Sequence, residues 1–215
     1  MSLLKQLSSQ TGDRTEASNR RVVMQCLDDP SLLREITGGL HSQDVRLVAD
    51  CAEVFAQVAE YHPEWVAPLA GELSVLLNHP HTRVRWEAMH ALALVVDFTP
   101  LTIQTLLPKL TEILQNDQSV IVRDYATDAI AFYASTGTTA AEAAFPLLVD
   151  MLTLWNGKQA AHALHGMEHI ADQLPEKRPE LHLIAEEYSR AGKPVVRKAA
   201  KALIKALASY PGNRL

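Results

Sequence analysis

A helical motif recurs along this chain with a period of a little under 40 residues. It begins at Val45 and recurs at Val84 and Val122, 39 and 38 residues further on. In each copy the valine precedes an arginine, and small or aliphatic residues then follow at helical spacing. Weaker copies begin at Gln159 and Val195, after further steps of 37 and 36 residues. Such a period predicts an array of similar helical units that bury their apolar faces against one another.

A second helical segment precedes each copy. Pro68, Pro108 and Pro146 fall in three of these leading segments at a nearly constant spacing, so we expect bent but continuous helices there. Pro63 and Pro100 stand where proline is favoured, at the first residue of a helix. Each period is therefore expected to form a pair of helices.

The sequence predicts an all-α fold, an α-solenoid of about five antiparallel helix pairs in an αα superhelix. Glycine is scarce, with nine residues among 215, and 47% of the residues are apolar, which favours helix over sheet. We expect capping helices at 1–29 and a tail at 210–215. The expected repeats are 30–62, 63–98, 99–136, 138–174 and 178–209.

Charge is distributed unevenly. Residues 191–215 carry six lysines and arginines and no acidic residue, whereas the preceding 190 residues carry 14 basic and 25 acidic side chains. An acidic body disfavours binding of nucleic acid along its length. The basic last helix could meet an acidic partner, or it could be only the solvated cap that a solenoid end requires.

Other sequence features concern location. No stretch approaches the roughly 18–20 apolar residues that span a bilayer, and the first residues do not resemble a signal peptide. Cys26 and Cys51 form no framework and are interpreted as free thiols. We therefore expect a cytoplasmic protein with no membrane segment.

The third copy and the segment before it resemble the HEAT-repeat consensus, and the resemblance extends over residues 30–209. The matching residues are Leu107-Pro108, Ile113-Leu114, Asp117 and Val122-Arg123-Asp124-Tyr125-Ala126. The resemblance implies that the second helix of each pair lines a concave face. It also implies that Arg46, Arg85 and Arg123 form a ladder with acids or amides of the turns, so these arginines are interpreted as structural.

If the second helices stack in register, side chains three and six residues after each reference position share a groove, and those two residues after it lie just beside them. Aromatic and acidic groups mixed in one groove suit a peptide with apolar anchors and basic residues. The alternative, a plain solvent-facing surface, stays open. The expected contact residues are Trp86, Glu87, His90, Asp124, Tyr125, Asp128, His162 and His165.

Three histidines share one stripe of one expected helix. His162, His165 and His169 are spaced by three and four residues, so their imidazoles could hold zinc or a similar ion. A single helix usually offers two ligands at good angles, so a third would come from elsewhere, such as Asp128 or Tyr125. Solvent-facing histidines are the other interpretation. No cofactor is expected otherwise.

Two enzyme families of HEAT-like fold provide alternatives. The deoxyhypusine hydroxylases bind iron through His-Glu dipeptides, and none occurs in this sequence. The alkylpurine DNA glycosylases use aromatic and acidic residues, which Trp86, Tyr125, Asp124 and Asp128 could supply, but they also need a basic groove that is missing here.

We therefore favour a protein–protein interaction scaffold that binds a peptide or protein partner without catalysis. A nucleic-acid-binding enzyme and a metal-binding repeat protein remain the alternatives. The oligomeric state stays open.

Overall fold

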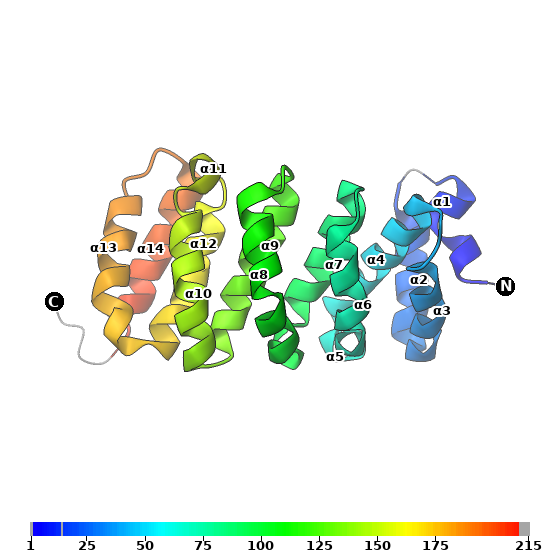
Figure 1. Ribbon diagram of the computed structural model, residues 1–215, viewed down its shortest axis with the longest axis horizontal. Helices are drawn as coiled ribbons and strands as arrows, with labels where there is room; N and C mark the ends of the chain where they lie inside the picture. Colours follow the sequence, from blue (N-terminus) through cyan, green and yellow to red (C-terminus); the bar gives the residue numbers. More distant parts are fainter. Residues whose placement is uncertain (1, 14, 211–215) are drawn as a thin grey trace. The chain divides into compact units, whose positions relative to one another are not determined.

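The computed structural model describes residues 2–13 and 15–210, and every regular element in this part of the chain is a helix (Figure 1). The chain divides into two compact units between Thr99 and Pro100. Residues 211–215 of the expected tail lie outside the described residues. Within the described part, no helix combines the length and the apolarity needed to cross a bilayer.

Unit 1 contains two predicted helix pairs behind an N-terminal cap. Short 3-10 helices, written η, interrupt or end several of its segments. Its elements are η1 (Leu4–Gln6), α1 (Ser8–Thr11), α2 (Ala17–Asp28), η2 (Pro30–Leu32), α3 (Leu33–Gly39), α4 (Val45–Ala59), α5 (Pro63–Val66), η3 (Ala67–Leu69), α6 (Ala70–Val75), η4 (Leu76–Asn78), α7 (Thr82–Leu94) and η5 (Val96–Phe98).

Unit 2 contains three further pairs, and most of its helices are longer. A short helix, α11, stands between the two members of the middle pair. The elements are α8 (Pro100–Asn116), α9 (Val120–Ser135), α10 (Thr138–Met151), α11 (Leu154–Gly157), α12 (Ala160–Gln173), η6 (Pro175–Lys177), α13 (Arg178–Tyr188) and α14 (Pro194–Ala208).

The second helices of successive pairs pack against one another inside each unit. In unit 1, α4 packs between α2 and α7, and in unit 2, α12 packs between α9 and α14. Of the first helices, α8 packs on α9, α10 packs on both α9 and α12, and α13 packs on α14. This is the stacked-pair arrangement that the sequence period predicted.

The three repeated prolines do not all act alike. Pro108 and Pro146 lie inside the continuous helices α8 and α10, as expected. Pro68 instead lies in the 3-10 segment η3 between α5 and α6, so the prediction of a continuous bent helix is wrong there. Proline has no backbone N–H to donate to the α-helical hydrogen-bond pattern. This leading segment consists of successive short helices, α5, η3 and α6, in place of one continuous helix.

Small residues allow the stacked helices to approach closely. Ala129, Ala131 and Ala163 are buried where α9 packs on α12. Gly166 of α12 has little room for a side chain, because a Cβ added there would lie 2.6 Å from Cβ of Ala131 and 3.1 Å from Cδ1 of Leu148. The side-chain volume at this position is therefore limited by the neighbouring helices.

Two of the arginines that follow the repeat valine donate hydrogen bonds to backbone carbonyls of the turn that precedes their own helix. Nη1 of Arg85 donates to the carbonyl oxygens of His79 and Pro80 at 2.9 and 3.0 Å. Nη1 of Arg123 donates to the carbonyl oxygen of Asp117 in the same way. The structural role expected for these two arginines is confirmed, but the acceptors are backbone carbonyls of the turn.

Arg197 of the last repeat makes the same kind of contact with the preceding turn, and this contact shows which valine of that repeat matches the repeat valine. Nη1 of Arg197 donates to the carbonyl oxygens of Ala191 and Gly192 at 2.9 and 2.7 Å. The valine equivalent to the repeat valine is thus Val196, which is 3% exposed, whereas Val195 is 59% exposed. The sequence alignment that began this copy at Val195 is wrong by one residue.

Arg46 departs from the pattern. Its side chain is 77% exposed, and its Nε lies 3.8 Å from Oδ1 of Asp44, which caps α4 by accepting from the backbone N–H of Arg46. The prediction that Arg46 belongs to a structural ladder is therefore not supported.

Arg123 also joins two neighbouring pairs. It is 1% exposed, its Nε lies 3.5 Å from Oε1 of Gln159, and its guanidinium stacks 4.0 Å from the centroid of the Trp155 ring. The indole N–H of Trp155 donates to the carbonyl oxygen of Leu114 at 2.7 Å. The partly buried Trp155 is therefore a packing residue that holds three segments of unit 2 together.

The close approach at Gly166 predicts that Gly166→Ala lowers the free energy of unfolding by about 1–3 kcal/mol, because the added methyl group overlaps Ala131. Gly71→Ala in α6 is the matched control, since nothing lies within 4 Å of its added Cβ. It should be neutral or stabilising by up to about 1 kcal/mol. Urea unfolding followed by circular dichroism measures both, and equal stability of the two variants would contradict the packing account.

Candidate functional site

The eight expected contact residues fall into two groups, one in each unit. Trp86, Glu87 and His90 lie on α7 of unit 1. The other five lie on α9 and α12 of unit 2, two helices that pack together: Asp124, Tyr125, Asp128, His162 and His165. Each group has its own geometry.

In unit 2 the two aspartates and His162 form one cluster. Nδ1 of His162 lies 2.7 Å from Oδ1 of Asp128, and Nε2 lies 3.9 Å from Oδ1 of Asp124. The side chains of Asp124, Asp128 and His162 are 26%, 27% and 37% exposed, so the cluster reaches solvent. The aspartates are four residues apart on α9 and therefore share a face. We call these three residues the α9–α12 cluster.

Gln159 fixes Asp124 within this cluster. Its amide Nε2 donates to Oδ1 of Asp124 at 3.0 Å, and the glutamine is fully buried. In the sequence, Gln159 stands out only as the start of a degenerate repeat.

The pKa of His162 is raised above its ordinary value. The hydrogen bond to Asp128 is the largest cause, burial opposes it, and the charges of Asp128 and Asp124 add to the increase. The protonated ring therefore stabilises the fold at low pH, and this contribution is lost as the pH rises through the raised pKa. With two carboxylates and one imidazole, the cluster carries net negative charge even when His162 is protonated.

The other histidines do not join His162. Nδ1 of His165 lies 3.6 Å from Oε1 of Glu168, and its side chain is 60% exposed. His169 stacks edge-on with Phe132, with ring centroids 6.2 Å apart. Among the described residues, no group of three or more histidine, cysteine or acidic side chains is arranged to hold a metal ion. This geometry does not support the metal site that the histidine spacing predicted.

Unit 1 places its three residues differently. Trp86 is half-buried, and His90 is 20% exposed with Nε2 at 3.9 Å from Oε1 of Glu60. Glu87 was expected to face a groove, but only 12% of its side chain is exposed, and Oε1 lies 3.9 Å from Nε of Arg83. Glu87 therefore belongs to an internal network.

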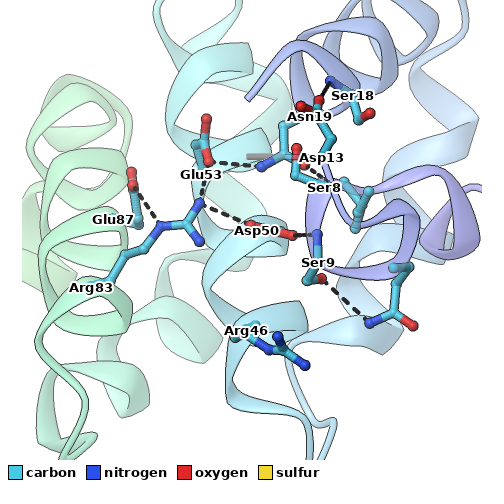
Figure 2. A network of polar contacts seen from close by, with 12 residues as sticks. Ser8, Ser9, Asp13, Ser18, Asn19, Arg46, Asp50, Glu53, Arg83 and Glu87 are labelled. Carbon is cyan, nitrogen blue, oxygen red and sulfur yellow. Dashed lines mark hydrogen bonds and ion pairs between the residues drawn. The ribbon is translucent and has the colours of Figure 1, made fainter. Parts of the chain in front are cut away.

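That network centres on Arg83, a residue that was not among the expected site residues (Figure 2). Its Nη2 lies 2.8 Å from Oδ1 of Asp50 and 2.6 Å from Oε2 of Glu53, both on α4. Asn19 of α2 donates to the same oxygen of Glu53 at 2.8 Å. The network thus links α2, α4 and α7. The sequence feature that could have predicted this network is the pair Asp50 and Glu53, two acidic residues three positions apart within the otherwise apolar stripe of α4.

Burial raises the pKa of Glu87 to about 7. Desolvation is the largest cause, a hydrogen bond from the Trp86 side chain opposes it, and the charge of Glu53 raises it further. Three carboxylates surround one guanidinium here, so one of them is favoured in its neutral form.

The raised pKa predicts a dependence of stability on pH. The folded state favours protonated Glu87, so its stabilising contribution is complete below the ordinary pKa of 4.5 and is lost as the pH rises through about 7. Glu87→Gln should match the wild type near pH 5 and exceed its free energy of unfolding near pH 8 by up to about 3 kcal/mol.

Denaturant unfolding across this pH range measures the effect. Asp97→Asn is the control, because Asp97 is exposed on the same unit. A stability difference between Glu87→Gln and wild type that does not change with pH would show that Glu87 is ionised throughout.

Comparison with known proteins identifies the fold. No family model matches the chain, and no curated protein matches it. Among solved structures, an engineered protein shares 19% identity over 96% of this chain and 95% of its own, with a TM-score of 0.72.

Two kinds of repeat protein also resemble the chain. Computationally designed armadillo repeat proteins for modular peptide recognition share 21% identity over 95% of this chain and 98% of theirs, with a TM-score of 0.67. An archaeal HEAT-like repeats protein from Thermococcus onnurineus NA1 shares 15% identity over 90% of this chain and 93% of its own, with a TM-score of 0.55. The fold is that of a helical-repeat solenoid, as the sequence predicted.

Proposed function

We propose that this protein is a recognition scaffold whose α9–α12 cluster binds a cationic side chain of a peptide or protein partner. The observation that carries the proposal is the pair of carboxylates, Asp124 and Asp128, which are one helical turn apart and a quarter exposed. Their spacing places two acceptor groups on one face, where a lysine or arginine side chain can contact both.

The carboxylates are held in place before any partner arrives. Buried Gln159 donates to Asp124, and His162 of the neighbouring helix holds Asp128. Little conformational entropy is therefore lost when a ligand binds, which is how rigid helical arrays gain affinity. Half-buried Tyr125, on the same helix, provides an aromatic surface beside the acids for an apolar residue of the partner.

The charge of the cluster argues against a phosphate backbone as the ligand. Two aspartates repel phosphates, whereas a nucleic-acid track requires several lysines and arginines along one face. The designed armadillo proteins of the same fold are described as made for modular peptide recognition, which supports a peptide as the ligand. In unit 1, half-buried Trp86 and His90 lie four residues apart on α7 and are proposed as further contacts.

The test is a selection of short random peptides on the immobilised protein, followed by titration of the best peptide by fluorescence anisotropy. We expect selected peptides to be enriched in lysine or arginine. The double variant Asp124→Asn/Asp128→Asn should weaken binding about tenfold or more, a loss of about 1.4 kcal/mol, because it keeps the side-chain shapes and removes both charges.

Glu142→Gln/Asp150→Asn is the matched control, since both acids are exposed on α10 of the same unit. It removes the same charge and should leave the affinity within about twofold of wild type. Equal losses in the two double variants would mean that only overall charge matters, and selected peptides without basic residues would also overturn the proposal.

A further inference from the structure

The ring of His162 lies beside both carboxylates of the α9–α12 cluster. Its Nδ1 is 2.7 Å from Oδ1 of Asp128, and its Nε2 is 3.9 Å from Oδ1 of Asp124. The ring comes from α12, and the two acids come from α9. The protein therefore places a titratable cation of its own at the site that is proposed to bind a cation of the partner.

The hydrogen bond to Asp128 determines which proton the ring loses. An ionised carboxylate only accepts hydrogen bonds, so Nδ1 of His162 carries a proton in both the charged and the neutral form of the bonded ring. The proton that leaves on titration is therefore the one on Nε2, the nitrogen that faces Asp124. His162 continues to hold Asp128 in both forms, and only the charge beside Asp124 changes.

Two other groups act on Asp124, and neither titrates near neutral pH. Its Oδ1 accepts from the neutral amide of buried Gln159 at 3.0 Å. The neighbouring Arg123 keeps its charge at every accessible pH, and its guanidinium is directed to a turn carbonyl and to the ring of Trp155. Of these three groups around Asp124, His162 is the one whose charge changes between about pH 5 and 8.

The other elements packed against α12 leave the charge of the ring to the two aspartates. The hydrogen bond to Asp128 and the charges of Asp128 and Asp124 raise the pKa of His162, and burial opposes them. On α12 itself, His165 and Glu168 contact each other. The elements α10, η6, α13 and α14 also pack on α12. Within the described residues, no ion pair joins the ring to their charged side chains, among them Glu142, Asp150, Lys177, Arg178, Lys198 and Lys201.

Protonation of the ring and binding of a cation therefore oppose each other at this site. When the ring is protonated, one positive charge offsets the two carboxylates, whereas with a neutral ring the cluster carries two negative charges. A cation of the partner is attracted more strongly to the second form. Because linkage is reciprocal, a bound cation in turn disfavours the protonated ring.

We propose that binding of a cationic partner at the α9–α12 cluster is coupled to release of the proton on Nε2 of His162. The partner is held at neutral and alkaline pH and is released as the pH falls. This inference rests on the proposed function, because it concerns the regulation of the same site. It requires no movement of the helices, since the ring holds Asp128 in both of its forms.

The first test compares the affinity at two pH values by fluorescence anisotropy. The probe is a basic peptide from the selection described above, without histidine or acidic residues and blocked at both ends, so that its charge is constant. Loss of one positive charge a few ångströms from a bound cation strengthens binding about tenfold at a partly exposed site. The wild type should therefore bind about tenfold more tightly at about pH 8.5 than at about pH 5.5.

Calorimetric titration in two buffers of different ionisation enthalpy counts the protons that are released. Between about pH 6 and 8.5, the wild type should release up to about one proton for each peptide bound, because the bound cation lowers the pKa of His162. His162→Gln should release none. Tight binding by the wild type without proton release at any of these pH values would overturn the coupling.

Two substitutions of His162 imitate its two forms. His162→Gln places a neutral amide donor near Asp128, so this variant should bind at pH 5.5 as tightly as at pH 8.5. His162→Lys keeps a positive charge throughout this range, so it should bind about tenfold more weakly than His162→Gln at both pH values. A pH dependence like that of the wild type in either variant would overturn the proposal.

Matched controls test whether another titrating group is responsible. His182 of α13 is 25% exposed, and its Nδ1 lies 3.9 Å from Oε1 of Glu186, so it resembles His162 without belonging to the cluster. The pKa of Glu87 in unit 1 is raised by burial to about 7. His182→Gln and Glu87→Gln should both keep the pH dependence of the wild type, and its loss in either would contradict the assignment to His162.

Failure of this inference can be distinguished from failure of the proposed function. Basic peptides that bind with the same affinity at both pH values, and that still require Asp124 and Asp128, would overturn the coupling and leave the scaffold proposal in place. Absence of binding at every pH would overturn both.

Discussion

In a helical repeat array a single helix pair buries too little apolar surface to fold alone, so the other features of this structure depend on how closely neighbouring pairs can stack. The second helices meet through alanines and through Gly166, where a single methyl group would collide with Ala131. Close packing leaves the exposed faces of these helices free for polar residues, because the core requires only their inner stripe. The positions of Asp124 and Asp128 follow from that packing: α12 presents Gln159 and His162 to them because it lies directly against α9.

Polar groups inside the stack serve two different purposes. In unit 2, buried Arg123 is satisfied by a turn carbonyl, an amide and an aromatic ring, and none of these partners is a carboxylate. In unit 1, Arg83 faces three carboxylates, and burial, with the charge of Glu53 adding to it, raises the pKa of Glu87. The partners of Arg123 in the first arrangement do not titrate, whereas in the second arrangement Glu87 changes its protonation near neutral pH. The two units therefore stabilise a buried or partly buried guanidinium in different ways, one with neutral partners and the other with carboxylates.

The sequence was sufficient to predict the helix pairs, because the period of the Val-Arg motif and the spacing of alanines reflect local helix geometry. It placed Asp124, Asp128 and His162 as contact residues, and they lie together because α9 and α12 stack in register. It failed where one residue of register decides the outcome, as with Val195 and Val196, and where a proline can either bend a helix or break it, as at Pro68. It also missed Arg83 and the network around it. That network reaches α2, which lies outside the repeat, so no periodicity relates Asn19 to α4 and α7.

The arginine contacts with the turn carbonyls join residues only five or six positions apart, so each is contained within one repeat. The contacts of Arg123 with Gln159 and of Arg83 with Asp50 and Glu53 instead join one repeat to the next. A duplication or deletion of one repeat in the gene would carry the first kind of contact intact and would break the second kind at the new junction. A change in the number of repeats would therefore need new matching side chains on both sides of the junction, whereas the arginine contacts inside each repeat would need no change.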